Sequence, residues 1–318
     1  MKKIAVIGTG LSALSLAYHL PALDITFFEK SWRPGGRIST RKHEQYAFDH
    51  GAHYLKLDHG VIGLNEFLKK IDHISYVQLH HGPTLAFKDI ALQFLGNAFE
   101  VFLKKEKKKL TIIGATSGDT GSAAIDAVKN NKFSDIFILH PYKRVSDFQR
   151  KQMTTVNASN VFNIALKGTF DDCQDIIKRL FRDNELNQRL NLGSINSINW
   201  TRIMAQITYY IYAYNKVKKE TGSSNISFSI PTGNFGDVFA GYLAKQMGLP
   251  IDKLIVATNE NDILQRVINT GEYKPDKVTP SLSPSMDIQV SSNFERLLFY
   301  VLKENDQKVD LLMKNLKN

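Results

Sequence analysis

The chain has 318 residues, of which 43% are hydrophobic and 23% charged, a composition typical of a soluble globular protein long enough for two domains. Lysine and arginine exceed aspartate and glutamate by 41 to 31, but they are scattered, and the one dense run, residues 104–109, is interpreted as a solvated helix end rather than a nucleic-acid patch. A single cysteine, Cys173, excludes an internal disulfide and argues against a cysteine-based metal site. No apolar run approaches the length of a membrane span. We therefore expect a cytosolic protein without metal, membrane or nucleic-acid partners.

The first segment is predicted to be a β-α-β unit. A short apolar strand, residues 4–7, is followed by a glycine turn, a helix and a second strand that ends at Glu29. The turn has the form Gly-x-Gly-x-x-Ala, with Gly8, Gly10 and Ala13 at the fixed positions. In this context the glycines let a dinucleotide pyrophosphate approach the helix N-terminus, and Glu29 lies where an acidic residue binds a ribose hydroxyl.

The residues after this unit indicate which dinucleotide it would bind. Residues 33–40, with Gly36 and Arg37, and then residues 48–54 resemble the flavin-binding start of the amine oxidase and renalase-like family. The resemblance covers residues 1 to about 71 and implies that Gly36 and Arg37 lie beside the phosphates of FAD. Because the rest of that family's flavin domain does not follow, two interpretations stay open: a flavin-dependent oxidoreductase, or a partial Rossmann unit that binds no FAD tightly.

The pattern changes after about residue 72. Strand-like segments alternate with helical ones, and one predicted helix has Ile203, Ile207 and Ile211 at helical spacing. The predicted strands include residues 110–113, 136–139, 228–230 and 254–256. This alternation predicts an α/β fold with a mainly parallel sheet. We therefore expect two domains, residues 1–71 and residues 72–318.

One lysine has an unusual setting. Lys88 begins a predicted helix after a Gly-Pro turn, and it follows the apolar residues Leu85, Ala86 and Phe87. A lysine with apolar neighbours can be activated to bind an aldehyde. A surface lysine that simply begins a helix would give the same local pattern.

Two loops add to this signal, because each follows a predicted strand and begins a predicted helix. Residues 114–122 place hydroxyls and free N–H groups at a helix N-terminus, which suits a carboxylate. Residues 231–237 contain two glycines that let backbone N–H groups converge on a phosphate. With Lys88, the loops supply what a phosphorylated aldehyde cofactor and an amino acid need.

These three segments resemble the threonine synthase family in order and spacing, over residues 74 to about 302. Further matching segments are residues 146–153, 168–173, 196–202, 257–262 and 282–288. The resemblance implies a fold type II body that is similar to the tryptophan synthase β subunit and uses pyridoxal 5'-phosphate (PLP). It also implies a lyase that converts O-phosphohomoserine, a small-molecule substrate, and water to threonine and phosphate.

The resemblance assigns roles to particular residues. Lys88 is implied as the Schiff-base lysine. The cofactor phosphate is implied to be held by Gly233, Asn234, Phe235 and Gly236. The cofactor hydroxyl and the substrate carboxylate are implied to face Asp119 and its neighbours Ser117, Gly118 and Thr120. The candidates for the substrate phosphate are Lys143, Ser146, Asn199 and Arg202, although Asn199 and Arg202 would also suit the flank of a helix and Lys143 a solvated loop.

The chain departs from the family pattern at both ends. The flavin-type segment stands where that family has the start of its small domain. The Gly-Thr-Ala-His-Pro-like motif, which carries the partner of the pyridine nitrogen, does not follow Tyr300. We therefore expect a fusion of two gene fragments with a PLP body that is incomplete at its C-terminus and falls short of full activity. A non-catalytic fusion stays open as an alternative.

Overall fold

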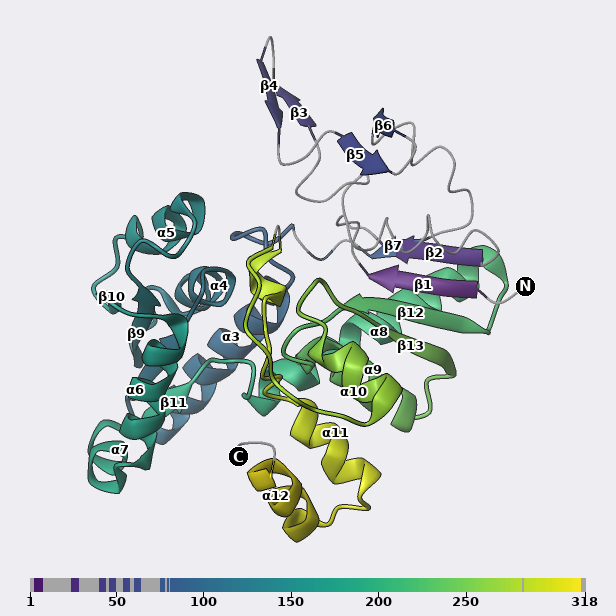
Figure 1. Ribbon diagram of the computed structural model, residues 1–318. Coiled ribbons are helices and arrows are strands. Elements are labelled where there is room, and N and C mark those ends of the chain that lie inside the picture. The colour runs from purple at the N-terminus through teal and green to yellow at the C-terminus, as the bar shows by residue number, and fades with distance from the viewer. Residues whose placement is uncertain are drawn as a thin grey trace. The chain divides into compact units, whose positions relative to one another are not determined.

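The computed structural model describes residues 75–77, 79, 81–281 and 283–315, together with six strands that precede them (Figure 1). These strands are β1 (Lys3–Ile7), β2 (Asp24–Phe28), β3 (Thr40–His43), β4 (Tyr46–Asp49), β5 (Tyr54–Leu57) and β6 (Gly60–Gly63). The chain forms two compact units. We call His80–Gln206 the central unit, and Met1–Leu79 with Ile207–Asn318 the flanking unit.

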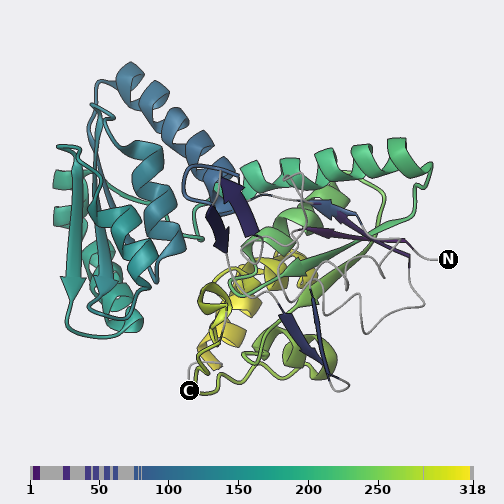
Figure 2. The ribbon, with the colours of Figure 1, turned by 90° about the horizontal axis from the view of Figure 1, so that it is seen from above.

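The central unit is built on a four-stranded parallel sheet in the order β10-β9-β8-β11. The strands are β8 (Leu110–Ala115), β9 (Ser134–Pro141), β10 (Val161–Leu166) and β11 (Leu192–Ser194). The helices are α3 (Lys88–Glu106), α4 (Asp119–Val128), α5 (Asp147–Thr154), α6 (Phe170–Arg182) and α7 (Asn184–Leu190). Helices α3 and α4 cover one face of this sheet and α6 the other (Figures 1 and 2).

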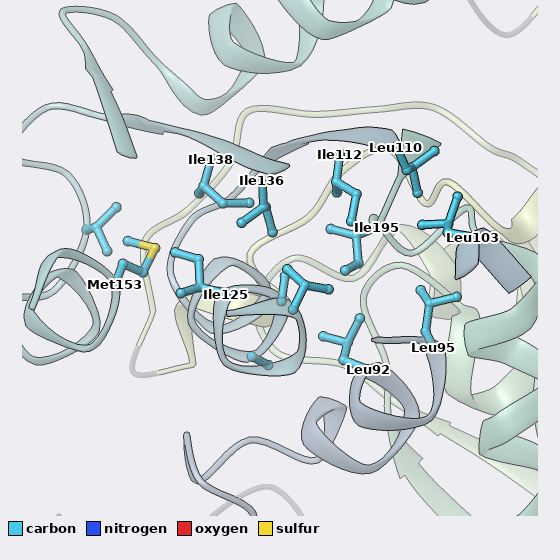
Figure 3. Close-up of a cluster of buried hydrophobic side chains, with 14 residues drawn as sticks. Leu92, Leu95, Leu103, Leu110, Ile112, Ile125, Ile136, Ile138, Met153 and Ile195 are labelled. Carbon is cyan, nitrogen blue, oxygen red and sulfur yellow. The ribbon is translucent and has the colours of Figure 1, made fainter. Parts of the chain in front are cut away.

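Alternation along the strands divides the apolar side chains between two layers of core. Ile112 points to the α3 and α4 side, where it joins Leu92, Leu95 and Ile125 in a fully buried cluster (Figure 3). Its neighbour Ile113 points the other way. The opposite cluster also contains Leu139 of β9 and the residues Cys173 and Ile177 of α6. Cys173 is therefore a buried core residue.

The flanking unit contains a five-stranded parallel sheet in the order β13-β12-β1-β2-β7. Its further strands are β7 (Tyr76–Val77), β12 (Ile226–Pro231) and β13 (Ile251–Ala257). Its helices are α9 (Gly236–Gln246), α10 (Ile263–Thr270), α11 (Phe294–Val301) and α12 (Asp306–Asn315), and the long helix α8 (Trp200–Thr221) enters it at Ile207. Strands β3 and β4, and strands β5 and β6, form antiparallel pairs.

Buried aromatic residues join α8 to the sheet. Tyr210 and Phe228 are both fully buried, with ring centroids 5.0 Å apart. Gly241 of α9 allows this packing, because a Cβ there would lie 2.6 Å from the Tyr210 ring. Helices α8 and α9 thus approach closely over the strand that leads into the loop at residues 232–235.

The predicted α/β class and the parallel sheets are confirmed. All four strands predicted after residue 72 lie within observed strands, and the helix predicted around Ile207 is part of α8. Residues 4–7 and 25–28 fall in β1 and β2, which pair in parallel. The domain boundary at residues 71 and 72 stays a prediction. Over the described ranges, no helix is both long and apolar enough to cross a membrane.

Candidate functional site

Lys88 is the first residue of α3, and the turn before it is held by the next residue. The Asp89 carboxylate accepts hydrogen bonds from the Thr84 backbone N–H at 3.0 Å, the Thr84 hydroxyl at 2.5 Å and the Ala86 N–H at 3.3 Å. Gly82 packs against the same carboxylate, and a Cβ there would lie 2.3 Å from it. Burial raises the pKa of Asp89, and the hydrogen bonds from Thr84 oppose that rise. The position of Lys88 is therefore fixed by a buried network.

The Lys88 amine is shielded and paired. Its Nζ lies 3.5 Å from Asp119 Oδ2, and only 12% and 14% of the two side chains are exposed. The amine also lies 5.4 Å from the centroid of the Phe87 ring. The Asp119 carboxylate is near enough to accept a proton from this amine, and an amine becomes a nucleophile only after it loses that proton. The surface-lysine interpretation of the sequence is wrong.

The loop between β8 and α4 presents the N-terminus of α4. Gly118 adopts a φ of +143°, which is strained for other residues. The N–H groups of Gly118 and Gly121 both donate to Thr116 Oγ1, at 2.9 and 2.8 Å. Ser117 and Thr120 keep part of their surface exposed. The loop thus offers two hydroxyls beside a helix N-terminus, where an anion is stabilised.

Gln149 links this loop to α5. Its Nε2 donates to Asp119 Oδ1, and its Oε1 accepts from the Ser146 hydroxyl at 3.0 Å. Ser146 is the N-cap of α5 and also accepts from the Gln149 N–H. A Cβ at Gly118 would collide with the Gln149 side chain. The structure therefore brings Lys88, Asp119, Gln149 and Ser146 into one connected group.

The other predicted phosphate ligands have different contacts. Asn199 Nδ2 donates to the Ser194 carbonyl, and its Oδ1 accepts from the Thr201 N–H near the start of α8. Arg202 is 3% exposed and donates to the Ile195 carbonyl. Lys143 is exposed, with its Nζ 5.4 Å from the centroid of the Tyr142 ring. The contacts of Asn199 and Arg202 fit the helix-flanking role that the sequence left open, and their role toward a substrate stays a prediction.

In the flanking unit, residues 232–235 connect β12 to α9. We call residues 233–236, which include the first residue of α9, the cradle loop. Phe235 is the N-cap of α9 with a φ of +63°, and its side chain has no oxygen that could cap the N–H groups of the first turn. At Gly233 a Cβ would lie 3.1 Å from Ile288 Cδ1 and 3.3 Å from Met286 Cα, so the backbone lies close beneath those residues. A left-handed residue at a helix start turns successive N–H groups inward, which suits an anion.

Asp237 lies in the first turn of α9, immediately after the cradle loop. The Tyr210 hydroxyl donates to its backbone carbonyl at 2.8 Å and to its Oδ1 at 3.2 Å. Burial raises the pKa of Asp237 to about 7, although the hydrogen bond from Tyr210 lowers it. A carboxyl that is partly neutral near neutral pH repels a neighbouring phosphate less than an ordinary aspartate would.

The sequence left some residues of this site without a role. Asp89 and Gln149 lie inside the matching segments, but what they do depends on contacts that spacing does not reveal. The only local signal for Gln149 is its position three residues after Ser146, which is typical of a helix N-cap pair. The predicted dinucleotide residues Gly8, Gly10, Ala13, Glu29, Gly36 and Arg37 lie outside the described residues.

Two protein families match the chain. Residues 64–310 match the family described as pyridoxal-phosphate dependent enzyme. Residues 6–70 match the NAD(P)-binding Rossmann-like domain. The two matches overlap at residues 64–70. The body that follows resembles fold type II enzymes, as expected.

Individual relatives are similar over the same region. The chain is 53% identical to threonine synthase from Saccharomyces cerevisiae over 242 residues, which are 73% of this chain and 47% of that protein. It is 54% identical to threonine synthase from Pseudomonas aeruginosa over 237 residues, which are 74% of this chain and 50% of that protein. The crystal structure of PLP-bound threonine synthase from Brucella melitensis matches with a TM-score of 0.69 and 50% identity, covering 76% of this chain and 51% of that one. The chain thus spans about half the length of the curated relatives it matches.

Proposed function

Because the chain belongs to the family of pyridoxal-phosphate dependent enzymes, we propose that it binds PLP and acts as a lyase of the threonine synthase type. The proposed reaction converts O-phosphohomoserine and water to threonine and phosphate. The observation that carries the proposal is the Lys88 amine, shielded from water and 3.5 Å from the Asp119 carboxylate. A cytosolic location belongs to the same proposal.

The residues of the cradle loop fit the cofactor phosphate. The loop has a glycine where a side chain would meet Met286 and Ile288, and it leads into a helix N-terminus that its N-cap residue leaves uncapped. A phosphate dianion is stabilised there by N–H groups and by the helix dipole. Near pH 7 the elevated pKa of Asp237 removes part of the negative charge that would oppose it.

Each residue of the central unit has a proposed task. When bound, PLP would act as an electron sink for the electron pair that stays on carbon each time a proton leaves Cα or Cβ. Lys88 holds the cofactor aldehyde and then carries protons, with Asp119 beside the amine as a proton acceptor. The substrate carboxylate is held by the loop at Ser117, Gly118 and Thr120. The substrate phosphate is held by Lys143, Ser146, Asn199 and Arg202, where positive charge stabilises the departing group.

The experiment that tests the proposal is an absorbance spectrum of the purified chain with added PLP, followed by borohydride reduction and peptide mapping. We expect a lysine adduct that reduction fixes on Lys88 and that Lys88→Ala abolishes. Lys105→Ala is the matched control, because Lys105 is an exposed lysine in the last turn of the same helix. An unchanged adduct in Lys88→Ala would overturn the assignment.

Activity is tested separately by phosphate release from O-phosphohomoserine. We expect wild type and Lys105→Ala to release phosphate at equal rates, and Lys88→Ala to be slower by roughly 10²–10⁴-fold, the range for loss of a positioned proton carrier. Chain that binds PLP but releases no phosphate would support the cofactor and contradict the lyase.

A second candidate function rests on a different observation. Residues 6–70 match the NAD(P)-binding Rossmann-like domain, and β1 pairs in parallel with β2 as a dinucleotide-binding unit requires. The same spectrum separates the candidates, because a bound flavin adds its own absorption, which Gly10→Val would remove and Lys88→Ala would leave unchanged.

A further inference from the structure

The cradle loop is held by a segment far from it in sequence. The Asn234 carbonyl accepts two hydrogen bonds from Asn293, one from its side-chain Nδ2 at 3.0 Å and one from its backbone N–H at 3.1 Å. The Ser292 hydroxyl donates to Asn234 Oδ1 at 3.0 Å. Asn293 is fully buried. Both the main chain and the side chain of Asn234 are therefore fixed by residues 292–293.

Fixing this carbonyl also fixes a donor. The carbonyl of Asn234 and the N–H of Phe235 belong to one planar trans peptide unit and point in opposite directions. A carbonyl held by Asn293 therefore directs the Phe235 N–H away from Asn293. Because Phe235 is the N-cap of α9 and has a left-handed φ of +63°, this N–H opens the run of donors at the start of the helix.

Residues 291–294 are themselves held from behind. The Asn293 Oδ1 accepts from Arg296 Nε at 3.0 Å, and Asn293 is the N-cap of α11. The ring of Phe294 meets Phe235 edge to face, with centroids 5.6 Å apart, and stacks on Tyr273 at 5.2 Å. The Tyr273 hydroxyl accepts from the Ser291 N–H at 2.7 Å. These contacts hold the amide of Asn293 in place.

We propose that Asn293 is a positioning residue for phosphate binding, which acts through the Asn234 carbonyl and aims the Phe235 N–H at the phosphate. The inference rests on the proposed function, since it takes the cradle loop as the phosphate site. Asn293 does not touch the ligand in this scheme. Loss of the Asn293 side chain therefore weakens binding of the phosphate group and leaves binding of the rest of the cofactor unchanged.

The test compares PLP with pyridoxal, which carries a hydroxyl in place of the phosphate, by titration of wild type and Asn293→Ala. We expect the Kd for PLP to rise about tenfold and the Kd for pyridoxal to change less than about twofold, because one buried hydrogen bond to the loop is lost. The melting temperature with and without inorganic phosphate gives a second readout. Phosphate stabilises wild type in this assay and stabilises Asn293→Ala less.

Asn160→Ala is the matched control. Asn160 is also buried and donates to the Val128 and Ser134 carbonyls at 2.9 and 2.8 Å, entirely within the central unit. We expect it to lower the melting temperature while retaining the preference for PLP over pyridoxal. This separates loss of stability from loss of phosphate recognition.

The outcomes are distinct. If wild type shows no preference for PLP over pyridoxal, the proposed function and this inference both fail. If wild type shows the preference and Asn293→Ala keeps it, only this inference fails. Should Asn293→Ala not fold, Asn293→Ser carries the same comparison, because serine is a favoured N-cap residue and would suit the start of α11. A reduced preference supports the role, and a wild-type preference overturns it.

Discussion

Among single residues, Asp237 has a pKa that lies far above its ordinary value. Its carboxyl is buried beside the hydroxyl of Tyr210. Burial raises the pKa of Tyr210 well above the usual value. Tyr210 therefore stays protonated and donates to the carboxyl. Because the hydrogen bond from Tyr210 lowers the pKa of Asp237, replacing Tyr210 by phenylalanine would raise that pKa further.

This residue predicts a pH dependence of stability. The pKa of Asp237 is about 7 in the folded chain against 3.8 for an ordinary aspartate, so the folded state binds the proton more tightly. Its contribution to stability is therefore lost as pH rises from 3.8 to about 7 and stays lost above that. Asp237→Asn, which keeps an acceptor for Tyr210, does not titrate.

The measurement is the unfolding free energy of Asp237→Asn and of wild type by urea titration between pH 3.8 and about 7. We expect the difference between them to grow in favour of the variant as pH rises. A difference that does not change with pH would show that Asp237 has an ordinary pKa.

The sequence predicted part of the site at this scale. It singled out Lys88 as a candidate because apolar neighbours and a Gly-Pro turn are local features. The role of Asp89 in holding that turn and of Asn293 in holding Asn234 could not be predicted, since both depend on which backbone groups the fold brings within 3.3 Å. A buried asparagine 59 residues from its partner leaves no local signal.

At the scale of elements, the contact between α3 and α4 positions both the lysine and the anion loop. Lys88 begins α3 and Asp119 begins α4, so their pairing depends on how these helices pack. Gly96 lies at the crossing, where a Cβ would stand 2.2 Å from the Ala127 carbonyl oxygen. No side chain fits there without separating the helices.

We therefore predict that Gly96→Ala lowers the unfolding free energy by about 1–3 kcal/mol, the usual cost of overpacking, despite the higher helix propensity of alanine. The same change should weaken formation of the Lys88 adduct with PLP. Asn97→Ala is the control, because Asn97 is the next residue of α3 and is exposed, and its effect should stay within about 0.5 kcal/mol. Equal stability of Gly96→Ala and wild type in chemical denaturation would contradict the close packing.

The elements themselves were largely predictable. Strands such as residues 110–113 and 136–139 are apolar runs between turns, and in β8 the neighbours Ile112 and Ile113 serve opposite faces of a sheet covered on both sides. What the sequence could not predict was the partner of each strand. Strand β1 pairs with β12, whose residues come more than two hundred positions later, and only the folded sheet reveals that adjacency.

For the whole molecule, this pairing changes the meaning of the N-terminal segment. Lys3, Ile4 and Ala5 pair with Ile226, Ser227 and Phe228, which places β1 between β12 and β2. Without β1, the strand that leads into the cradle loop would keep its pairing with β13 and lose it on the other side. The segment is therefore part of the sheet, whether or not it also binds a dinucleotide.

This role predicts the result of removing residues 1–71. An apolar strand with unpaired N–H and C=O groups favours aggregation, so we expect the shortened chain to melt at a lower temperature and to scatter more light on heating. Ala5→Pro offers a milder version, because proline removes a backbone donor from the middle of β1 and leaves the rest of the segment in place. Both variants should lose stability in differential scanning calorimetry, and both should do so with or without added FAD. If the shortened chain were as stable and monodisperse as the full one, β1 would contribute nothing to this sheet. If instead only FAD-bound chain were stabilised by the segment, its function would be that of a flavin site.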